Sequence, residues 1–235
     1  MTFTLLIVED EPEITELLTL YLEKEYHLLL ARDGLEAISI IKKHKVHLAI
    51  LDVMMPRMDG FQLIKEIRKE HHFPVLFLSA RINDHDKILG LNLGADDYIG
   101  KPFNPLEIVA RVNSALRRVY RFNQLKEPDS NFEQILLGDL LLDLKECTLM
   151  KEKQMVPLTS TEYKILSLFM KHPGRVFTHK NIYETIWEST FAYDNNTIMV
   201  HISNIREKIE DNPKKPLYLK TIRGLGYKFE TPLEK

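Results

Sequence analysis

The feature that most constrains the fold is an apolar run that ends in an acid. Residues 47–51 read His-Leu-Ala-Ile-Leu, Asp52 follows directly, and Pro56 and Gly60 then impose a turn. An uninterrupted apolar run of this length is typical of a strand buried on both faces, as in a parallel sheet. An acid at the carboxyl end of such a strand either caps a turn or lies where open α/β sheets bind their ligands. The residues that end the other strands decide between these two interpretations.

Composition limits the class of protein. The chain has 235 residues, of which 44% are hydrophobic, and this is enough for one large or two ordinary domains. Its one cysteine, Cys147, cannot form an internal disulfide, so nothing favours an oxidising compartment. The amino terminus lacks the basic region of a signal peptide, and no apolar stretch approaches the roughly 20 residues of a membrane span. We therefore expect a cytoplasmic protein that does not associate with membranes.

Residues 1–121 predict five strand–helix units in succession. Apolar runs begin at about Leu5, His27, His47, Pro74 and Asp97, and helical periodicity follows each of them. Regular alternation of strands and helices is typical of the α/β class. Because the crossover connections are right-handed, we expect a doubly wound five-stranded parallel sheet with helices on both faces.

A second domain follows a change of pattern. Residues 122–133 are polar and without periodicity, which predicts a linker. Residues 134–235 predict an α+β domain, with short strands over 135–155, helices over 159–170, 179–187 and 195–211, and a hairpin around 223–226. Thr159 and Glu162 have the spacing of a helix capping box.

Polar residues end four of the five predicted strands. Glu9 and Asp10 end the first, Asp52 the third, Ser79 the fourth and Lys101 the fifth, and such ends meet in one crevice of a doubly wound sheet. Neighbouring carboxylates repel one another and usually hold a hard divalent cation. A lysine and a hydroxyl can donate to phosphoryl oxygens. Because the sequence has no glycine-rich phosphate loop, we expect phosphoryl transfer to a carboxylate rather than nucleotide binding.

Five segments in this order resemble the receiver domain of two-component response regulators. They are Glu9-Asp10-Glu11, Asp52 with residues 55–60, Ser79-Ala80, residues 94–98 and Lys101-Pro102-Phe103, and the resemblance spans residues 3–121.

The resemblance implies a role for each of these residues. A sensor histidine kinase would phosphorylate Asp52, and Mg²⁺ would be held by Asp10, Asp52 and the backbone carbonyl of Met54, with Glu9 acting through water. Ser79 and Lys101 would bind the phosphoryl oxygens, and Tyr98 would be the aromatic switch. Many receivers have Asp in place of Glu9, which leaves the reach of the Glu9 side chain open.

Six charged residues are similar in type and position to those that form the receiver dimer interface of the OmpR and PhoB regulators. By themselves such residues are surface charges worth little. In that family the matching positions pair across a two-fold receiver dimer, and a two-fold interface doubles every pair. The resemblance would pair Lys87 with Glu107, Asp97 with Arg111, and Asp96 with Arg118.

An amphipathic helix over residues 196–209 is the candidate for DNA recognition. Ile198, Ile202, Ile205 and Ile209 form one inward stripe. Thr197, Val200, Ser203 and Asn204 fall away from that stripe, where they could meet base edges. Residues 196–228 hold 7 basic and 3 acidic residues, 7 − 3 = +4, which favours a surface that faces phosphates.

This region resembles the winged helix-turn-helix effector domain of the same family, over about residues 134–230. The resemblance implies that Arg223 enters the minor groove and that DNA contacts also come from Lys180, Asn196, Thr197, Arg206, Tyr227 and Lys228. Ser203 and Asn204 stand where many members have two arginines, so bidentate guanine contacts are lost. Asn204 either pairs with adenine or, like Ser203, only approaches the backbone.

Together these features predict a phosphorylation-activated transcription factor of the OmpR/PhoB type, which is no enzyme beyond its own phosphoryl transfer and dephosphorylation. The implied partners are the kinase, promoter DNA with tandem half-sites, RNA polymerase and a second copy of the chain. Asn195-Asn196-Thr197 and residues 218–221 also resemble regulators of glycopeptide resistance, the VanR-like branch. A haloacid dehalogenase phosphatase would need an Asp where Met54 stands, which excludes it. A receiver with a protein-binding output is the alternative that stays open.

Overall fold

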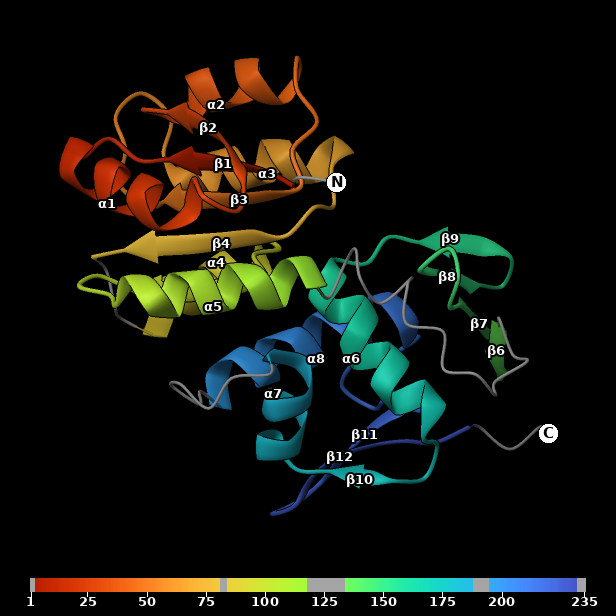
Figure 1. Ribbon diagram of the computed structural model, residues 1–235. Coiled ribbons are helices and arrows are strands. Elements are labelled where there is room, and N and C mark those ends of the chain that lie inside the picture. The colour runs from red at the N-terminus through yellow and green to blue at the C-terminus, as the bar shows by residue number, and fades with distance from the viewer. Residues whose placement is uncertain (1–2, 81–83, 118–133, 188–194, 232–235) are drawn as a thin grey trace. The chain divides into compact units, whose positions relative to one another are not determined.

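The computed structural model describes residues 3–80, 84–117, 134–187 and 195–231 (Figure 1). The chain divides into two compact units, Met1–Val119 and Tyr120–Lys235, which are taken separately below. The linker expected over residues 122–133 lies outside the described residues. Among the helices of the described ranges, none is long and apolar enough to cross a membrane.

The first unit is a parallel five-stranded sheet, as the sequence predicts. Its strands are β1 (Thr4–Val8), β2 (His27–Ala31), β3 (Leu48–Asp52), β4 (Val75–Ser79) and β5 (Asp97–Gly100). All neighbouring pairs are parallel, in the order β2-β1-β3-β4-β5. The reversal of strand order between β1 and β3 places the carboxyl ends of these two strands beside each other, where this fold binds ligands.

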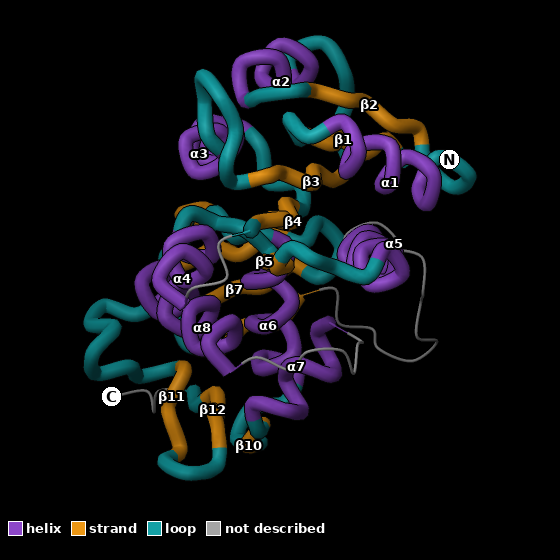
Figure 2. The backbone as a smooth tube through the Cα atoms, turned by 90° about the vertical axis from the view of Figure 1, so that its left-hand side faces the viewer, coloured by secondary structure: helices purple, strands orange, loops and turns teal. Residues whose placement is uncertain are grey.

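Helices cover both faces of this sheet. They are α1 (Pro12–Leu22), α2 (Gly34–Ile41), α3 (Gly60–Glu70), α4 (Asp84–Asn92) and α5 (Pro105–Leu116). In Figure 2, α1 and α5 lie on one side of the strands and α2, α3 and α4 on the other. The central strands β3 and β4 are therefore buried on both faces at every residue, which explains their continuous apolar runs, whereas the edge strand β2 is partly exposed.

A tight turn links β3 to α3. Asp59 caps α3 in a capping box with Gln62. The Gly60 N–H donates to the Val53 carbonyl at 3.0 Å. A Cβ at Gly60 would lie 2.3 Å from the Asp52 carbonyl oxygen, so only glycine lets the turn fold back this closely. The turn fixes the backbone on the carboxyl side of Asp52.

Over its described residues, 134–187 and 195–231, the second unit has an antiparallel sheet, three helices and a smaller sheet, as expected for an α+β domain. The first sheet contains β6 (Gln134–Leu137), β7 (Leu140–Asp143), β8 (Thr148–Lys151) and β9 (Gln154–Val156). The helices are α6 (Ser160–Lys171), α7 (His179–Trp187) and α8 (Asn195–Ile209). The second sheet has the order β10-β12-β11, with β10 (Val176–Phe177), β11 (Leu219–Ile222) and β12 (Gly226–Phe229). The sequence did not predict β10, because two residues carry no periodicity.

The core of this unit confirms two predictions. Thr159 and Glu162 form the capping box of α6. The isoleucine stripe of α8 is buried among aromatic residues from α6, α7 and β12, including Phe169, Trp187 and Phe229. Burial of this stripe fixes which face of α8 stays outside.

A buried carboxylate ties α8 to β11. Glu210 is 7% exposed, and its carboxylate accepts hydrogen bonds from the backbone N–H groups of Leu217, Tyr218 and Leu219 at 2.7, 3.0 and 2.8 Å. Hydrogen bonds to a charged acceptor contribute more to folding stability than hydrogen bonds between neutral groups. This contact sets the position of the hairpin that follows.

We expect Glu210→Gln to lower the free energy of unfolding of the second unit by about 1.5–3 kcal/mol, because the amide has one acceptor oxygen and no charge. Urea unfolding followed by the fluorescence of Trp187 measures this. Glu207→Gln is the control, since Glu207 is exposed on the same helix. Equal midpoints for the two variants would contradict the role given to Glu210.

Candidate metal centre and nucleic-acid interface

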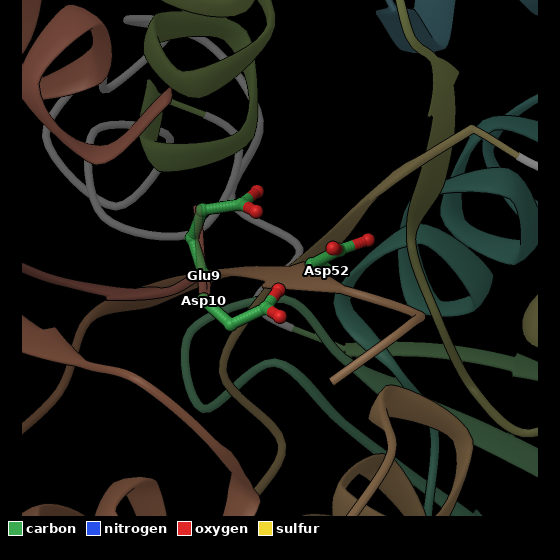
Figure 3. Close-up of side chains that lie close together, drawn as sticks. All are labelled: Glu9, Asp10 and Asp52. Atoms are coloured by element: carbon green, nitrogen blue, oxygen red, sulfur yellow. The ribbon is translucent and has the colours of Figure 1, made fainter. Parts of the chain in front are cut away.

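Three carboxylates meet at neighbouring strand ends of the first unit. Glu9 and Asp10 follow β1 and Asp52 ends β3, and their oxygens lie within 4.8 Å of one another (Figure 3). Glu9 and Asp52 are buried, whereas Asp10 is exposed. A set of oxygen donors with one open side fits a hard divalent cation that keeps several water ligands. The sequence-predicted acidic cluster is therefore present.

The lysine that follows β5 lies against this cluster. The Lys101 Nζ is 2.9 Å from Glu9 Oε2 and 3.1 Å from Asp52 Oδ2. Its backbone N–H donates to the Ser79 carbonyl at 2.7 Å, and the Lys101–Pro102 peptide bond is cis. The strand ends thus bring Lys101, Glu9 and Asp52 together as the sequence predicts.

One neighbour of Lys101 was missed. Glu11 Oε1 lies 3.1 Å from the Lys101 Nζ. Glu11 is the N-cap residue of α1, and its side chain makes no capping hydrogen bond, so it is available to the lysine. The one signal in the sequence is that Glu11 continues the acidic segment Glu9-Asp10.

The electrostatics of the cluster follow from burial and these ion pairs. Burial raises the pKa of the Glu9 carboxyl to about 7, and the nearby Asp52 adds to this, against the opposing effect of Lys101. Burial by itself would lower the pKa of the Lys101 ammonium, but its contacts with Glu9 and Asp52 outweigh burial and raise it. A metal ion bound beside Glu9 would oppose this effect and favour its ionised form.

Three further predicted site residues lie on or next to the same strands. Ser79 is buried at the end of β4, opposite Gly100 in the register with β5. The Met54 N–H donates to Asp52 Oδ1 at 3.3 Å, while its side chain is half exposed. Tyr98 is buried with its ring centroid 5.9 Å from that of Phe77. Their implied roles at the site stay predictions.

This arrangement suits group transfer to a carboxylate. Asp52 offers a carboxylate oxygen at the open end of the sheet, and Lys101 supplies a positive charge 3.1 Å away. Fixed positive charges beside a carboxylate stabilise the charge that develops on a transferring phosphoryl group.

The predicted dimer residues have partners within the chain. Arg111 forms ion pairs with Asp97 and, at 2.7 Å, with Glu107. Asp96 is buried and accepts hydrogen bonds from the Val75 N–H at 3.0 Å and from Arg68 at 3.2 Å. Lys87 is half-buried, and Arg118 lies outside the described residues. Pairing across a dimer stays a prediction, and Arg111 and Asp97 would have to rearrange or share their present contacts.

The outward face of α8 is smaller than expected. Ser203 is exposed and Asn204 partly exposed, but Thr197 and Val200 are buried. The prediction that both side chains are exposed is wrong. The periodicity of α8 explains neither burial, because Met199 lies the same one residue, about 100° around the helix, from Ile198 as Thr197 does and is 52% exposed.

Arg206 holds the hairpin rather than extending into solvent. Its guanidinium donates to the Leu219 carbonyl at 2.6 and 2.8 Å and to Thr221 Oγ1 at 2.9 Å. Arg223 is exposed at the tip of this hairpin, which we call the wing (residues 219–229), next to Gly224 with a φ of +74°. The wing therefore exposes Arg223 at its tip, while Arg206 attaches the strands of the wing to α8.

The other residues that are predicted to contact DNA differ in their exposure to solvent. Lys180 is exposed and 3.7 Å from Glu184, and Asn196 is partly exposed. Tyr227 is buried, with its ring edge-on to His179 at 5.1 Å. Lys228 is partly exposed and forms an ion pair with Glu230.

Comparisons with known proteins cover both units. Residues 5–113 match the response regulator receiver domain, and residues 152–229 match the C-terminal domain of transcriptional regulatory proteins. The chain is 49% identical to the response regulator GtcR of Aneurinibacillus migulanus, covering 97% of this chain and 96% of GtcR. It is 43% identical to the regulatory protein VanRc of Enterococcus gallinarum, covering 98% and 100%.

A solved structure is similar to the chain over nearly its full length. The response regulator DrrB of Thermotoga maritima, described as an OmpR/PhoB homologue, is 28% identical, with a TM-score of 0.53 over 98% of this chain and 100% of DrrB. Each of these relatives thus matches both units of the chain.

Proposed function

This chain belongs to the two-component response regulators of the OmpR/PhoB family, and we propose that phosphorylation of Asp52 by a sensor histidine kinase controls its binding to promoter DNA. The observation that carries the proposal is the contact of Lys101 with Asp52, beside Glu9 and Asp10, at one end of the parallel sheet.

The proposed transfer starts from the contact between Lys101 and Asp52. An Asp52 carboxylate oxygen attacks the phosphorus of a phosphohistidine, the P–O bond forms, and the P–N bond breaks with its electrons passing to the imidazole. Lys101 exchanges its contact with Asp52 for a phosphoryl oxygen, and the Ser79 hydroxyl donates to another. Asp10, Asp52 and the Met54 carbonyl would hold Mg²⁺, with Glu9 acting through water; when bound, the ion supplies positive charge beside the transferring oxygens.

The proposed output is a dimer on DNA. Phosphorylation would fix Tyr98 in its inward position and favour a two-fold receiver dimer through Lys87, Asp96, Asp97, Glu107, Arg111 and Arg118. Two effector domains would then bind tandem half-sites and recruit RNA polymerase. We place the protein in the bacterial cytoplasm, where the promoter is.

We expect a small phosphodonor with Mg²⁺ to increase the affinity for a mapped promoter fragment at least about tenfold, because dimerisation links two binding events. A gel shift with and without phosphodonor measures it. Sedimentation of the same samples reports the dimer. The receiver with a protein-binding output predicts no shift in either state, and that result would overturn the proposal.

The lifetime of the phosphorylated state is a separate expectation. Met54 lies two residues after Asp52 and is half exposed beside it. Its side chain cannot orient an attacking water through a strong hydrogen bond, so we expect slow self-hydrolysis.

We therefore expect Met54→Asn to shorten the half-life of the acyl phosphate several-fold, since an amide can hold that water. Loss of label from purified phosphoprotein at fixed Mg²⁺ gives the rate. Met54→Leu is the control, since it stays apolar. An unchanged or longer half-life in Met54→Asn would contradict this account.

A further inference from the structure

Two lysines of the wing and the glutamate that directly follows it form a compact charged cluster. Lys220 on β11 and Lys228 on β12 are directly opposite each other in the antiparallel register. The carboxylate of Glu230 forms an ion pair with each of them, through a different oxygen. The cluster carries a net charge of 2 − 1 = +1, and its three side chains are 24–42% exposed.

Without Glu230 the two lysines would be an unfavourable pair. Like charges directly opposite on neighbouring strands repel. Glu230 is well placed to separate them, because its backbone N–H donates to the Tyr218 carbonyl at 2.8 Å and extends the hairpin by one hydrogen bond. The two lysines lower the pKa of its carboxyl to about 2, so Glu230 is ionised at any physiological pH.

The cluster lies on the outer face of the wing. Leu219 and Phe229 are buried and point into the core, and side chains alternate along a strand, so Lys220 and Lys228 point outward. Arg206 holds the inner side of the wing through Leu219 and Thr221. The structure thus leaves the lysines where a further binding partner can reach them.

The distance between the lysines and Arg223 at the tip of the wing matches the dimensions of a DNA minor groove. Lys220 stands three residues before Arg223, which is about 10 Å along a strand. A minor groove is about 6 Å wide and is bordered by two phosphate chains. An arginine in the groove therefore places these lysines near the backbone at its border. The ligand that fits two ammonium groups around a shared carboxylate is another oxyanion, a phosphate.

We propose that Lys220 and Lys228 form a site for one DNA phosphate and that Glu230 occupies this site in the free protein. DNA binding exchanges the carboxylate for a phosphate, so Glu230 lowers affinity for every DNA sequence alike. This inference rests on DNA binding by the second unit; it adds Lys220 as a contact and Glu230 as a competitor.

The test compares charge-neutralised variants of the full-length protein. Glu230→Gln keeps the shape of the side chain and removes its charge. We expect it to raise affinity about three- to tenfold for both promoter and unrelated duplex DNA. It should also steepen the salt dependence, because no carboxylate is left to take up a cation when the phosphate enters.

The second variant tests the lysine. Lys220→Gln should weaken binding to both DNAs and reduce the salt slope by about one. In the double variant Lys220→Gln/Glu230→Gln, most of the gain from Glu230→Gln should disappear. Glu146→Gln is the control, since Glu146 is exposed in the β7–β8 turn and gives the same change of net charge.

Each other outcome overturns the proposal. Unchanged or lower affinity in Glu230→Gln means that Glu230 does not compete with DNA for the lysines, and a lowered melting temperature in the same variant means that it only braces the two strands. An equal rise in Glu146→Gln means that net charge alone acts. If Lys220→Gln leaves the salt slope as it was, no phosphate binds there. Failure of the wild-type protein to bind any duplex would instead refute the proposed function.

Discussion

Asp52→Asn should abolish phosphorylation by both a histidine kinase and small phosphodonors, to below about 1% of the wild-type yield. The amide is not a nucleophile of comparable strength, and it offers neither the charge that Mg²⁺ requires nor a full ion pair for Lys101. The neighbouring carboxylates do not replace it. Glu9 is buried and paired with Lys101, and Asp10 lies at the exposed border of the cluster. The acid-labile phosphoprotein formed from labelled donor measures the yield.

Asp59→Asn is the matched control for this variant. Asp59 lies seven residues further on and caps α3, and asparagine caps helices as well as aspartate does. The same chemical change should therefore leave phosphorylation within about twofold of wild type. A normal yield in Asp52→Asn would show that another residue is the acceptor and would remove the basis of the proposed function.

The site could be predicted because topology alone brings its parts together. The carboxyl ends of β1, β3, β4 and β5 lie along one edge of the parallel sheet, so a residue that ends any of these strands belongs to the same crevice. The strand boundaries from the sequence were wrong by one residue at β1, β3 and β4, yet Asp52 and Ser79 still fall at the strand ends. A prediction that a residue lies near a strand end is still correct after an error of one residue, whereas a prediction of side-chain contacts is not.

Contacts that depend on side-chain geometry could not be predicted. Glu11 reaches Lys101 across 90 residues of sequence, and nothing in the spacing distinguishes it from a surface acid. Arg206 is a residue type that often contacts phosphates, but here it binds the Leu219 carbonyl and the Thr221 hydroxyl of the wing. Glu210 likewise accepts hydrogen bonds from the backbone at the start of β11, a role that only the folded register reveals. Periodicity identifies the apolar face of an element but leaves open which polar partner each outward residue finds.

Gly226→Ala should abolish specific DNA binding while leaving phosphorylation of Asp52 intact. Gly226 begins β12, the central strand of the wing sheet, and its φ is +149°. A Cβ there would lie 2.0 Å from the Phe177 carbonyl oxygen of β10. This oxygen belongs to the backbone and cannot turn aside, so β10 and β12 must separate. The variant therefore loses the geometry that presents Arg223, a contact worth about 1–3 kcal/mol, together with the order of the wing around it.

Gly224→Ala separates this steric effect from backbone strain. Gly224 also has a positive φ, +74°, but a Cβ there would meet no atom within 4 Å. Alanine should cost about 1–2 kcal/mol through the left-handed conformation alone. Its wing keeps the pairing of β10 with β12, so promoter affinity should fall by less than about tenfold. Competition binding to the mapped promoter, with melting curves for both variants, tests the comparison. Equal affinities for Gly224→Ala and Gly226→Ala would mean that the β10–β12 contact does not position the wing, and that strain at the tip governs how Arg223 meets DNA.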